Sequence, residues 1–197
     1  MKAVIQRVKS ASVTVDEKLI SSIGRGLLVL AGVGKGDTEK DADTLISRIL
    51  KAKLWPTEEG GQWKRNVQDI EGEVLCVSQF TLYGQLKKGS KPDFHDAADV
   101  ETARKLYDYF FQRLQDAYKP ERVQNGVFQA MMDVELKNDG PVGVNYRSED
   151  AAVTIEINTQ LPKKEKQPGE EESKRKGERK DGETQTIEFE LPASLLE

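Results

Sequence analysis

The stretch Gly26-Leu27-Leu28-Val29-Leu30-Ala31-Gly32-Val33-Gly34 is a continuous apolar run bounded by glycines. It is too short for an ordinary helix and is typical of a strand that is buried on both faces. We therefore expect this run to be the central strand of a sheet.

The segments on either side of this run predict further strands. Residues 1–8 and 11–15 alternate apolar and polar side chains and are rich in β-branched residues, which predicts a hairpin at the start of the chain. Later strands are expected at residues 73–80, 127–136 and 152–157.

Two amphipathic helices accompany these strands. Residues 37–55 carry apolar side chains at three-and-four spacing, with Asp37 or Thr38 as the cap and Pro56 as the stop. Residues 99–118 show the same spacing. Several strands and two helices without strict alternation predict an α+β fold.

The composition excludes several classes of protein. A length of 197 residues suits one domain with a tail, and a net charge of -4 argues against a large, uniform basic surface. Cys76 is the only cysteine, so no intrachain disulfide can form. Because the start is charged and no run approaches about 20 apolar residues, we expect a cytoplasmic protein without a membrane segment.

The composition changes near residue 160. Residues 163–183 contain 8 Lys/Arg and 7 Asp/Glu and almost no apolar side chains, which cannot offset the entropy cost of ordering. We therefore expect a domain at 1–159 and a charged, disordered tail at 160–197. Residues 186–191 alternate again, which is compatible with an edge strand or a short interaction motif.

The conventional catalytic side chains are few. Ser78, Thr81 and Cys76 are candidate nucleophiles, but each needs a base at neutral pH. The sole histidine, His95, has no acid at a recognisable spacing, so a Ser-His pair competes with a surface or packing role. One His and one Cys cannot supply the usual ligands of a zinc site, and we expect no metal and no cofactor.

Two short motifs offer chemistry through backbone groups. Residues 78–81, Ser-Gln-Phe-Thr, supply successive amides and the Gln79 side chain for an oxyanion hole, although polar residues at a strand end also simply satisfy backbone groups. Gly140-Pro141 is a turn signal. If its peptide bond were cis, two carbonyls turned to one side could bind an ammonium group.

Taken together, these motifs resemble the D-aminoacyl-tRNA deacylases, also called the D-tyrosyl-tRNA deacylase family, and suggest a eukaryotic, fungal-like member. Each segment is weak alone, but their order and spacing are specific. The resemblance covers residues 1–159 and rests on residues 1–8, 11–13, 26–34, 78–82, 91–94, 130–132 and 138–142. It implies a mixed, barrel-like sheet with two main helices, assembled as a homodimer.

The resemblance implies hydrolysis of the ester that joins a D-amino acid to the 3′ end of tRNA, a step of translation quality control. Gly140-Pro141 would reach across the homodimer, hold the substrate ammonium through its carbonyls and leave no room for an L side chain. Because glycine has no side chain, glycine mischarged on alanine tRNA would also be accepted.

The resemblance also assigns a pocket for the adenosine and the scissile carbonyl, lined by Ser78, Gln79, Phe80, Phe94, Met131 and Met132. The two methionines have core packing as an equal alternative. Thr81 is a nucleophile candidate, but a mechanism in which the tRNA 2′-hydroxyl assists water suits a chain without a usable base.

One segment departs from the family pattern, which runs from Gly-Pro-Val directly into the last strand. Residues 143–153 intervene here. They either bulge out as a loop, which preserves Gly140-Pro141, or shift the strand register and turn the following side chains to the other face. An inactive dimeric scaffold is the corresponding alternative.

Contacts with nucleic acid have two candidate segments. The basic residues 87–91 suit phosphate contacts with aminoacyl-tRNA or a solvated loop equally well. The tail suggests weak nucleic-acid or protein contacts, and a replication-origin-associated binding protein is the rival function. Its net charge of +1 over residues 163–183 (8 minus 7) argues against strong attraction to DNA.

Overall fold

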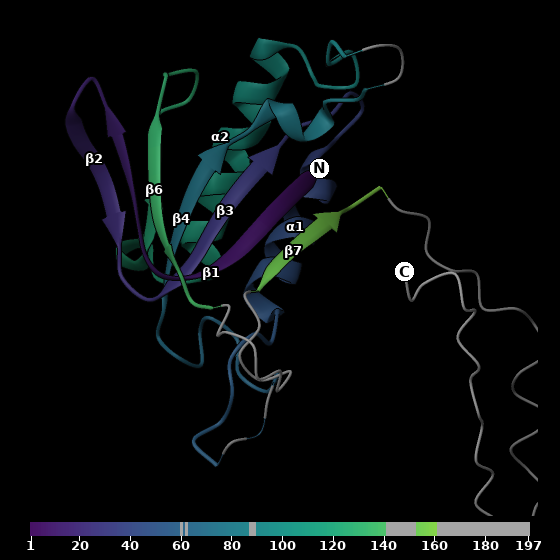
Figure 1. Cartoon of the computed structure of the whole chain (residues 1–197). Coiled ribbons are helices and arrows are strands. Elements are labelled where there is room, and N and C mark those ends of the chain that lie inside the picture. The colour runs from purple at the N-terminus through teal and green to yellow at the C-terminus, as the bar shows by residue number, and fades with distance from the viewer. Residues whose placement is uncertain (60, 62, 87–89, 141–152, 161–197) are drawn as a thin grey trace, which may run out of the picture. The chain divides into compact units, whose positions relative to one another are not determined.

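The computed structural model describes residues 1–59, 61, 63–86, 90–140 and 153–160 (Figure 1). The chain divides into two units, Met1–Leu161 and Pro162–Glu197, and every described residue belongs to the first. The strands are β1 Lys2–Val15, β2 Lys18–Ile23, β3 Gly26–Gly32, β4 Glu73–Ser78, β5 Val123–Asn125, β6 Asp133–Asn138 and β7 Thr154–Asn158. The helices are α1 Glu39–Lys51 and α2 Val100–Ala117, with 3₁₀ helices η1 Phe80–Tyr83 and η2 Pro120–Arg122.

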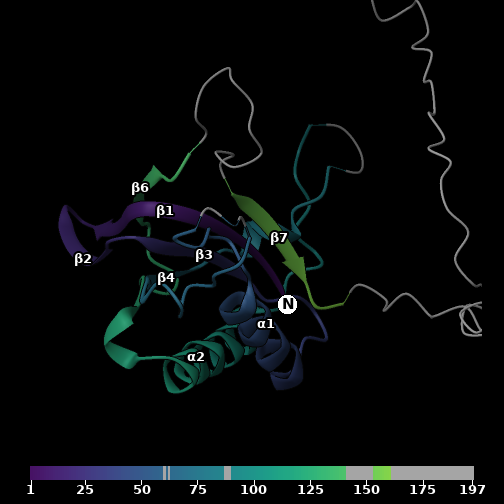
Figure 2. The ribbon, with the colours of Figure 1, turned by 90° about the horizontal axis from the view of Figure 1, so that it is seen from below.

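The seven strands form one mixed sheet with the order β2-β1-β3-β4-β5. Strand β3 is central, as predicted, and β3, β4 and β5 run parallel. The long strand β1 also pairs with β7 through Lys2–Gln6 and with β6 through Val8–Thr14. The sheet therefore curls into a nearly barrel-shaped structure, and the α+β prediction is confirmed (Figures 1 and 2).

Helices α1 and α2 cover one face of this sheet (Figure 2). Leu27 and Val29 of β3 belong to the core shared with the helices, whereas Leu28 belongs to a second cluster beneath β1, β2 and β4. All three side chains are at most 1% exposed. Because burial of such a side chain contributes about 1.5–3 kcal/mol, the apolar run of β3 stabilises both sides of the sheet.

The hairpin predicted at the start of the chain forms between β1 and β2, but residues 1–8 and 11–15 belong to one 14-residue strand, β1. Its pairing with β6 shifts register between Val8 and Ser10, so an irregularity changes the phase of the alternation there. The turn of the hairpin lies at Asp16 and Glu17, whose φ angles of 49° and 61° suit a tight two-residue connection to β2.

Both predicted helices form, and only the end of the first one was misplaced. Thr38 caps α1 and donates both its N–H and its hydroxyl to Asp41. The helix ends at Lys51, because the N–H groups of the next buried residues, Leu54 and Trp55, bond to the carbonyl of Arg65. Asp99 caps α2 through the Thr102 N–H, at 3.0 Å.

The strand predicted at residues 127–136 is displaced. The structure has a short strand at Val123–Asn125 and the next at Asp133–Asn138, with a turn between them. Gln129 has a φ of 66°, and the Ala130 N–H bonds to the Val127 carbonyl at 3.2 Å. The apolar residues of this turn were mistaken for a strand because they line a pocket.

The flanks of the 143–153 segment are both fixed by the backbone of Arg7. Its carbonyl accepts from the Asp139 N–H at 3.1 Å, and its N–H donates to the Val153 carbonyl at 3.0 Å. Strand β7 then pairs with β1 in a regular register. Residues 141–152 lie outside the described residues, as do the predicted tail segments from residue 161 onwards. No helix in the described ranges is long and apolar enough to cross a bilayer.

Candidate active site

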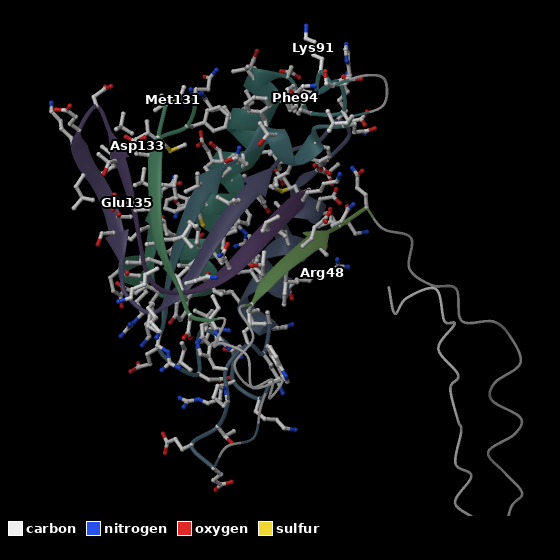
Figure 3. The ribbon with its side chains drawn as sticks, in the orientation of Figure 1. Arg48, Lys91, Phe94, Met131, Asp133 and Glu135 are labelled. Atoms are coloured by element: carbon white, nitrogen blue, oxygen red, sulfur yellow. The ribbon has the colours of Figure 1, made fainter. Side chains whose placement is uncertain are left out.

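A pocket of about 720 Å³ opens at the carboxyl ends of β3 and β4. The carboxyl ends of parallel strands are a frequent place for ligand sites. Figure 3 shows Phe94 and Met131 on this end of the molecule. Six residues predicted for the site line the pocket: Ser78, Gln79, Phe80, Phe94, Met131 and Met132.

Gln79 is fixed at the pocket by two hydrogen bonds. Its backbone N–H donates to the Ala31 carbonyl of β3 at 2.8 Å. Its side-chain Nε2 donates to the Thr81 hydroxyl oxygen at 2.5 Å. The backbone amide of Gln79 is therefore already used by the sheet, and only its side chain and the amides that follow it are left for a ligand.

Phe80 and Phe94 form one wall of the pocket. Their rings meet edge to face with centroids 5.3 Å apart. Phe94 packs directly on Gly84, where an added Cβ would lie 2.8 Å from the ring. Phe80 is 59% exposed, which is unusual for a phenylalanine that only packs and suits a side chain that meets a ligand.

The opposite wall comes from α2 and the turn before β6. Tyr107 and Phe128 line it, with ring centroids 5.7 Å apart. Neither residue was predicted for the site, because the sequence pattern places Tyr107 on the buried face of a helix and Phe128 within a strand at 127–136. Met131 is 89% exposed and does not fill the core, whereas Met132 packs against the second cluster and its sulfur accepts the Val127 N–H at 3.3 Å.

Neither Cys76 nor Thr81 lies in surroundings that would activate it as a nucleophile. Burial raises the pKa of the Cys76 thiol far above neutrality. Burial also raises the pKa of the Tyr107 hydroxyl. The hydroxyl of Thr81 contacts the uncharged Gln79 amide and is outside the lining of the pocket.

His95 does not form the Ser-His pair considered from the sequence. Its ring contacts the Asp93 carboxylate, its side chain is 87% exposed, and it does not line the pocket. Within the described ranges, no group of three or more His, Cys, Asp or Glu residues is placed to hold a metal ion.

Gly140 lies at the far end of β6, away from the pocket. Its φ of 106° is a conformation that L residues rarely adopt. The preceding residue, Asp139, is held by Arg7, whose Nε lies 3.1 Å from Asp139 Oδ2 and whose Nη2 donates to the Asp139 carbonyl at 3.2 Å. Arg7 Nη1 donates to the Leu54 carbonyl at 2.6 Å, so this buried side chain ties Asp139 to the segment after α1.

The sequence predicts a site made of the pocket residues and of Gly140-Pro141. Within one chain, the pocket and Gly140 are far apart. Met132 precedes β6 and Asp139 follows it, and a strand of 6 residues spans about 20 Å. Figure 1 shows the two ends of β6 at opposite ends of the sheet. Pro141 lies outside the described residues.

Comparison with known proteins identifies the family of the chain. A family model for D-Tyr-tRNA(Tyr) deacylase matches residues 4–147. The chain belongs to this family. A D-aminoacyl-tRNA deacylase of Yarrowia lipolytica is 55% identical over 148 residues, which are 74% of this chain and 96% of that protein. D-aminoacyl-tRNA deacylase 1 of Danio rerio is 47% identical over 175 residues, 89% of this chain and 83% of that protein.

Two solved structures have a fold similar to that of this chain. The structure of a c-Myc DNA Unwinding Element Binding Protein has a TM-score of 0.72 and 44% identity, and covers 80% of this chain and 98% of its own. A probable eukaryotic D-amino acid tRNA deacylase, with a TM-score of 0.63 and 17% identity, shares the fold. The family and the fold predicted from the sequence are therefore confirmed.

Proposed function

We propose that this chain hydrolyses the ester of D-aminoacyl-tRNA and releases the free D-amino acid and tRNA. The supporting observation is the pocket at the ends of β3 and β4, which gathers six residues that the sequence assigned to the substrate. Membership of the deacylase family, and relatives named D-aminoacyl-tRNA deacylase, support the same reaction.

In the proposed mechanism, the terminal adenosine enters between the aromatic wall of Phe80 and Phe94 and the methionine turn. Water attacks the ester carbonyl carbon, and negative charge develops on the carbonyl oxygen. The side-chain amide of Gln79 and the backbone amides of Phe80 and Thr81 are the proposed donors to this oxygen. The ester C–O bond then breaks, and the 3′ oxygen of the tRNA leaves with a proton.

The proton transfer is assigned to the 2′-hydroxyl of the tRNA, which assists the attacking water. This assignment follows from the surroundings of Thr81, whose hydroxyl contacts an uncharged amide at 2.5 Å. A threonine nucleophile needs an adjacent base, and Gln79 cannot act as one. Thr81 is therefore assigned to holding the Gln79 side chain in place.

Chiral selection is assigned to Gly140-Pro141 of a second copy of the chain. The length of β6 supports this arrangement, because Gly140 is about 20 Å of strand away from the pocket of its own chain. In a homodimer, the carbonyls of the motif would hold the substrate ammonium, and its bulk would exclude an L side chain. Glycine attached to alanine tRNA has no side chain to exclude and would also be accepted. The reaction is assigned to the cytoplasm, where tRNA is charged.

The alternative of a DNA-binding protein has one similar structure in its favour, whose name describes DNA binding. The pocket and the family support hydrolysis instead. A gel shift that compares the full chain with a chain ending at Thr159 tests the alternative. Equal and negligible affinity for DNA would exclude it.

The direct test of the proposed function is to incubate the purified protein with D-tyrosyl-tRNA and with L-tyrosyl-tRNA and to follow ester loss. Loss of the D ester alone supports the proposal and shows that the 143–153 segment is tolerated. A folded protein that cleaves neither ester would contradict it and favour the inactive scaffold.

A further inference from the structure

Asp37 is a buried carboxylate to which the sequence gave no role beyond a helix cap. Its exposure is 9%, and its side chain is fully buried. Thr38 caps α1 instead, so capping does not explain Asp37. Because a buried charge is costly unless it is paired and hydrogen-bonded, its partners indicate its role.

Two of these partners approach Asp37 Oδ2. The Gly34 N–H donates to it at 2.6 Å, and the Tyr83 hydroxyl donates at 3.0 Å. Gly34 is in the loop after β3, and Tyr83 is the last residue of η1. One carboxylate oxygen therefore joins this loop to the 3₁₀ helix that carries Phe80 and Thr81.

The partners of the other oxygen, Oδ1, include the positive charge that balances the Asp37 carboxylate. The α-ammonium of Met1 lies 2.5 Å away, and its exposure is also zero. The Gln160 side-chain amide donates to the same oxygen at 2.8 Å. Near it, the Thr159 hydroxyl bonds to Met1 and Asp41, so the end of β7 completes the enclosure. Figure 1 shows the N-terminus beside this end of the sheet.

The ring of Tyr83 is held as firmly as its hydroxyl. An added Cβ at Gly34 would lie 2.5 Å from two ring carbons, so only glycine permits this contact. Lys2 Nζ lies 4.7 Å from the ring centroid. Burial, followed by the charge of Asp37, raises the pKa of the Tyr83 hydroxyl, which therefore stays protonated and able to donate.

A second wall of the pocket depends on the same loop. The Lys35 N–H donates to the Asp96 carbonyl, and the Ala98 N–H donates to the Val33 carbonyl, each at 3.0 Å. Ala97, which pairs with Gly34 as a β-bridge, lines the pocket together with Ala98. The turn at Gly34 and Asp37 is therefore the common support of η1 and of this wall.

From these contacts we infer that Asp37 is a positioning residue for the reaction, acting through Tyr83 to hold η1 at the pocket. It touches no substrate. Displacement of catalytic groups by about 1 Å can cost about a hundredfold in rate, so a loosened η1 lowers kcat more than it alters KM. The kinetic part of this inference rests on the proposed function.

The test is Tyr83→Phe, which removes the hydroxyl that donates to Asp37 and keeps the ring on Gly34. Tyr118→Phe is the matched control, because its hydroxyl donates to the Gly72 carbonyl at 2.8 Å, outside the lining of the pocket. Hydrogen exchange over residues 79–84 and steady-state kinetics with D-tyrosyl-tRNA are measured for both.

The inference predicts faster exchange over residues 79–84 and a kcat about tenfold lower in Tyr83→Phe, with KM changed by less than about twofold. Tyr118→Phe should leave both quantities as in the unmodified protein. If Tyr83→Phe exchanges over residues 79–84 like the control, the inference is overturned. If the unmodified protein cleaves no ester, the proposed function fails, and the exchange data still decide whether Asp37 holds η1.

Asp37→Asn extends the test, because it weakens the contact with Tyr83 and also leaves the Met1 ammonium without its carboxylate. A protein that folds should show the same local exchange as Tyr83→Phe. Unchanged exchange in a folded Asp37→Asn protein would likewise overturn the inference.

Discussion

The pocket and the segment at Asp139 and Gly140 are held in different ways. At the pocket end, Gln79 bonds into the sheet, Phe94 packs on Gly84, and η1 is tied to Asp37. At the other end, the carboxylate and the backbone carbonyl of Asp139 both contact the Arg7 guanidinium. This difference fits the division of roles that we propose, in which one end carries the chemistry and the other selects the substrate.

Pro141→Ala should have the largest effect, because it removes the bulk that we assign to chiral exclusion. We expect deacylation of D-tyrosyl-tRNA to fall by about a hundredfold or more, since the substrate ammonium loses its placement. Steady-state kinetics with the D and L esters measure the change. A variant with full activity and full preference for the D ester would show that the selector lies elsewhere.

Gln79→Ala should have the next largest effect, at the pocket end. Loss of a donor to the developing oxyanion costs about a hundredfold in kcat. Gln112→Ala is the control, because its amide contacts Asp116 at 3.2 Å on α2. Equal kinetics for the two variants would exclude Gln79 from the reaction.

Arg7→Met should separate the two ends, because Arg7 contacts Asp139 and Leu54 and does not line the pocket. Removing one partner of a buried charge pair costs about 3 kcal/mol in the free energy of unfolding, so we expect a clear fall in Tm. Deacylation should fall about tenfold. Binding of adenosine to the pocket should not change.

A suitable control for Arg7→Met is Arg48→Met. The Arg48 guanidinium also donates to a carbonyl, that of Asn158 at 3.0 Å, but on the surface (Figure 3). If the two variants lose the same stability and activity, Arg7 has no special link to Gly140.

Thr81→Ala should have the smallest effect. Its hydroxyl accepts a single neutral hydrogen bond from the Gln79 amide, so we expect kcat to fall by less than about threefold. A folded variant with no activity would replace the mechanism assisted by the 2′-hydroxyl with a threonine nucleophile. Single-turnover kinetics distinguish the two.

The sequence predicted best where the pattern of side chains follows the local backbone. The apolar run of β3, the cap of α1 and the delivery of Ser78 to the end of β4 were predictable, because each depends on neighbouring residues. The prediction failed at Ser10, where the alternation changes phase, and at 127–132, where apolar side chains face a pocket.

The support of the site was harder to predict than its lining. Asp37, Tyr83 and Met1 are far apart in the sequence, and no spacing rule joins them. The sequence pattern shows Gly32 and Gly34 and assigns them only to the end of a strand. Their contacts with η1 depend on the folded sheet.

We propose that the pocket of one copy works with Gly140-Pro141 of another copy, and mixed subunits test this arrangement directly. Pro141→Ala and Gln79→Ala proteins are purified separately, unfolded together, refolded and assayed with D-tyrosyl-tRNA. Random pairing makes about half of the dimers mixed, and each mixed dimer has one site with both halves intact. Our account predicts recovery of about a quarter of the unmodified activity, whereas activity no higher than the average of the two separate variants would contradict it.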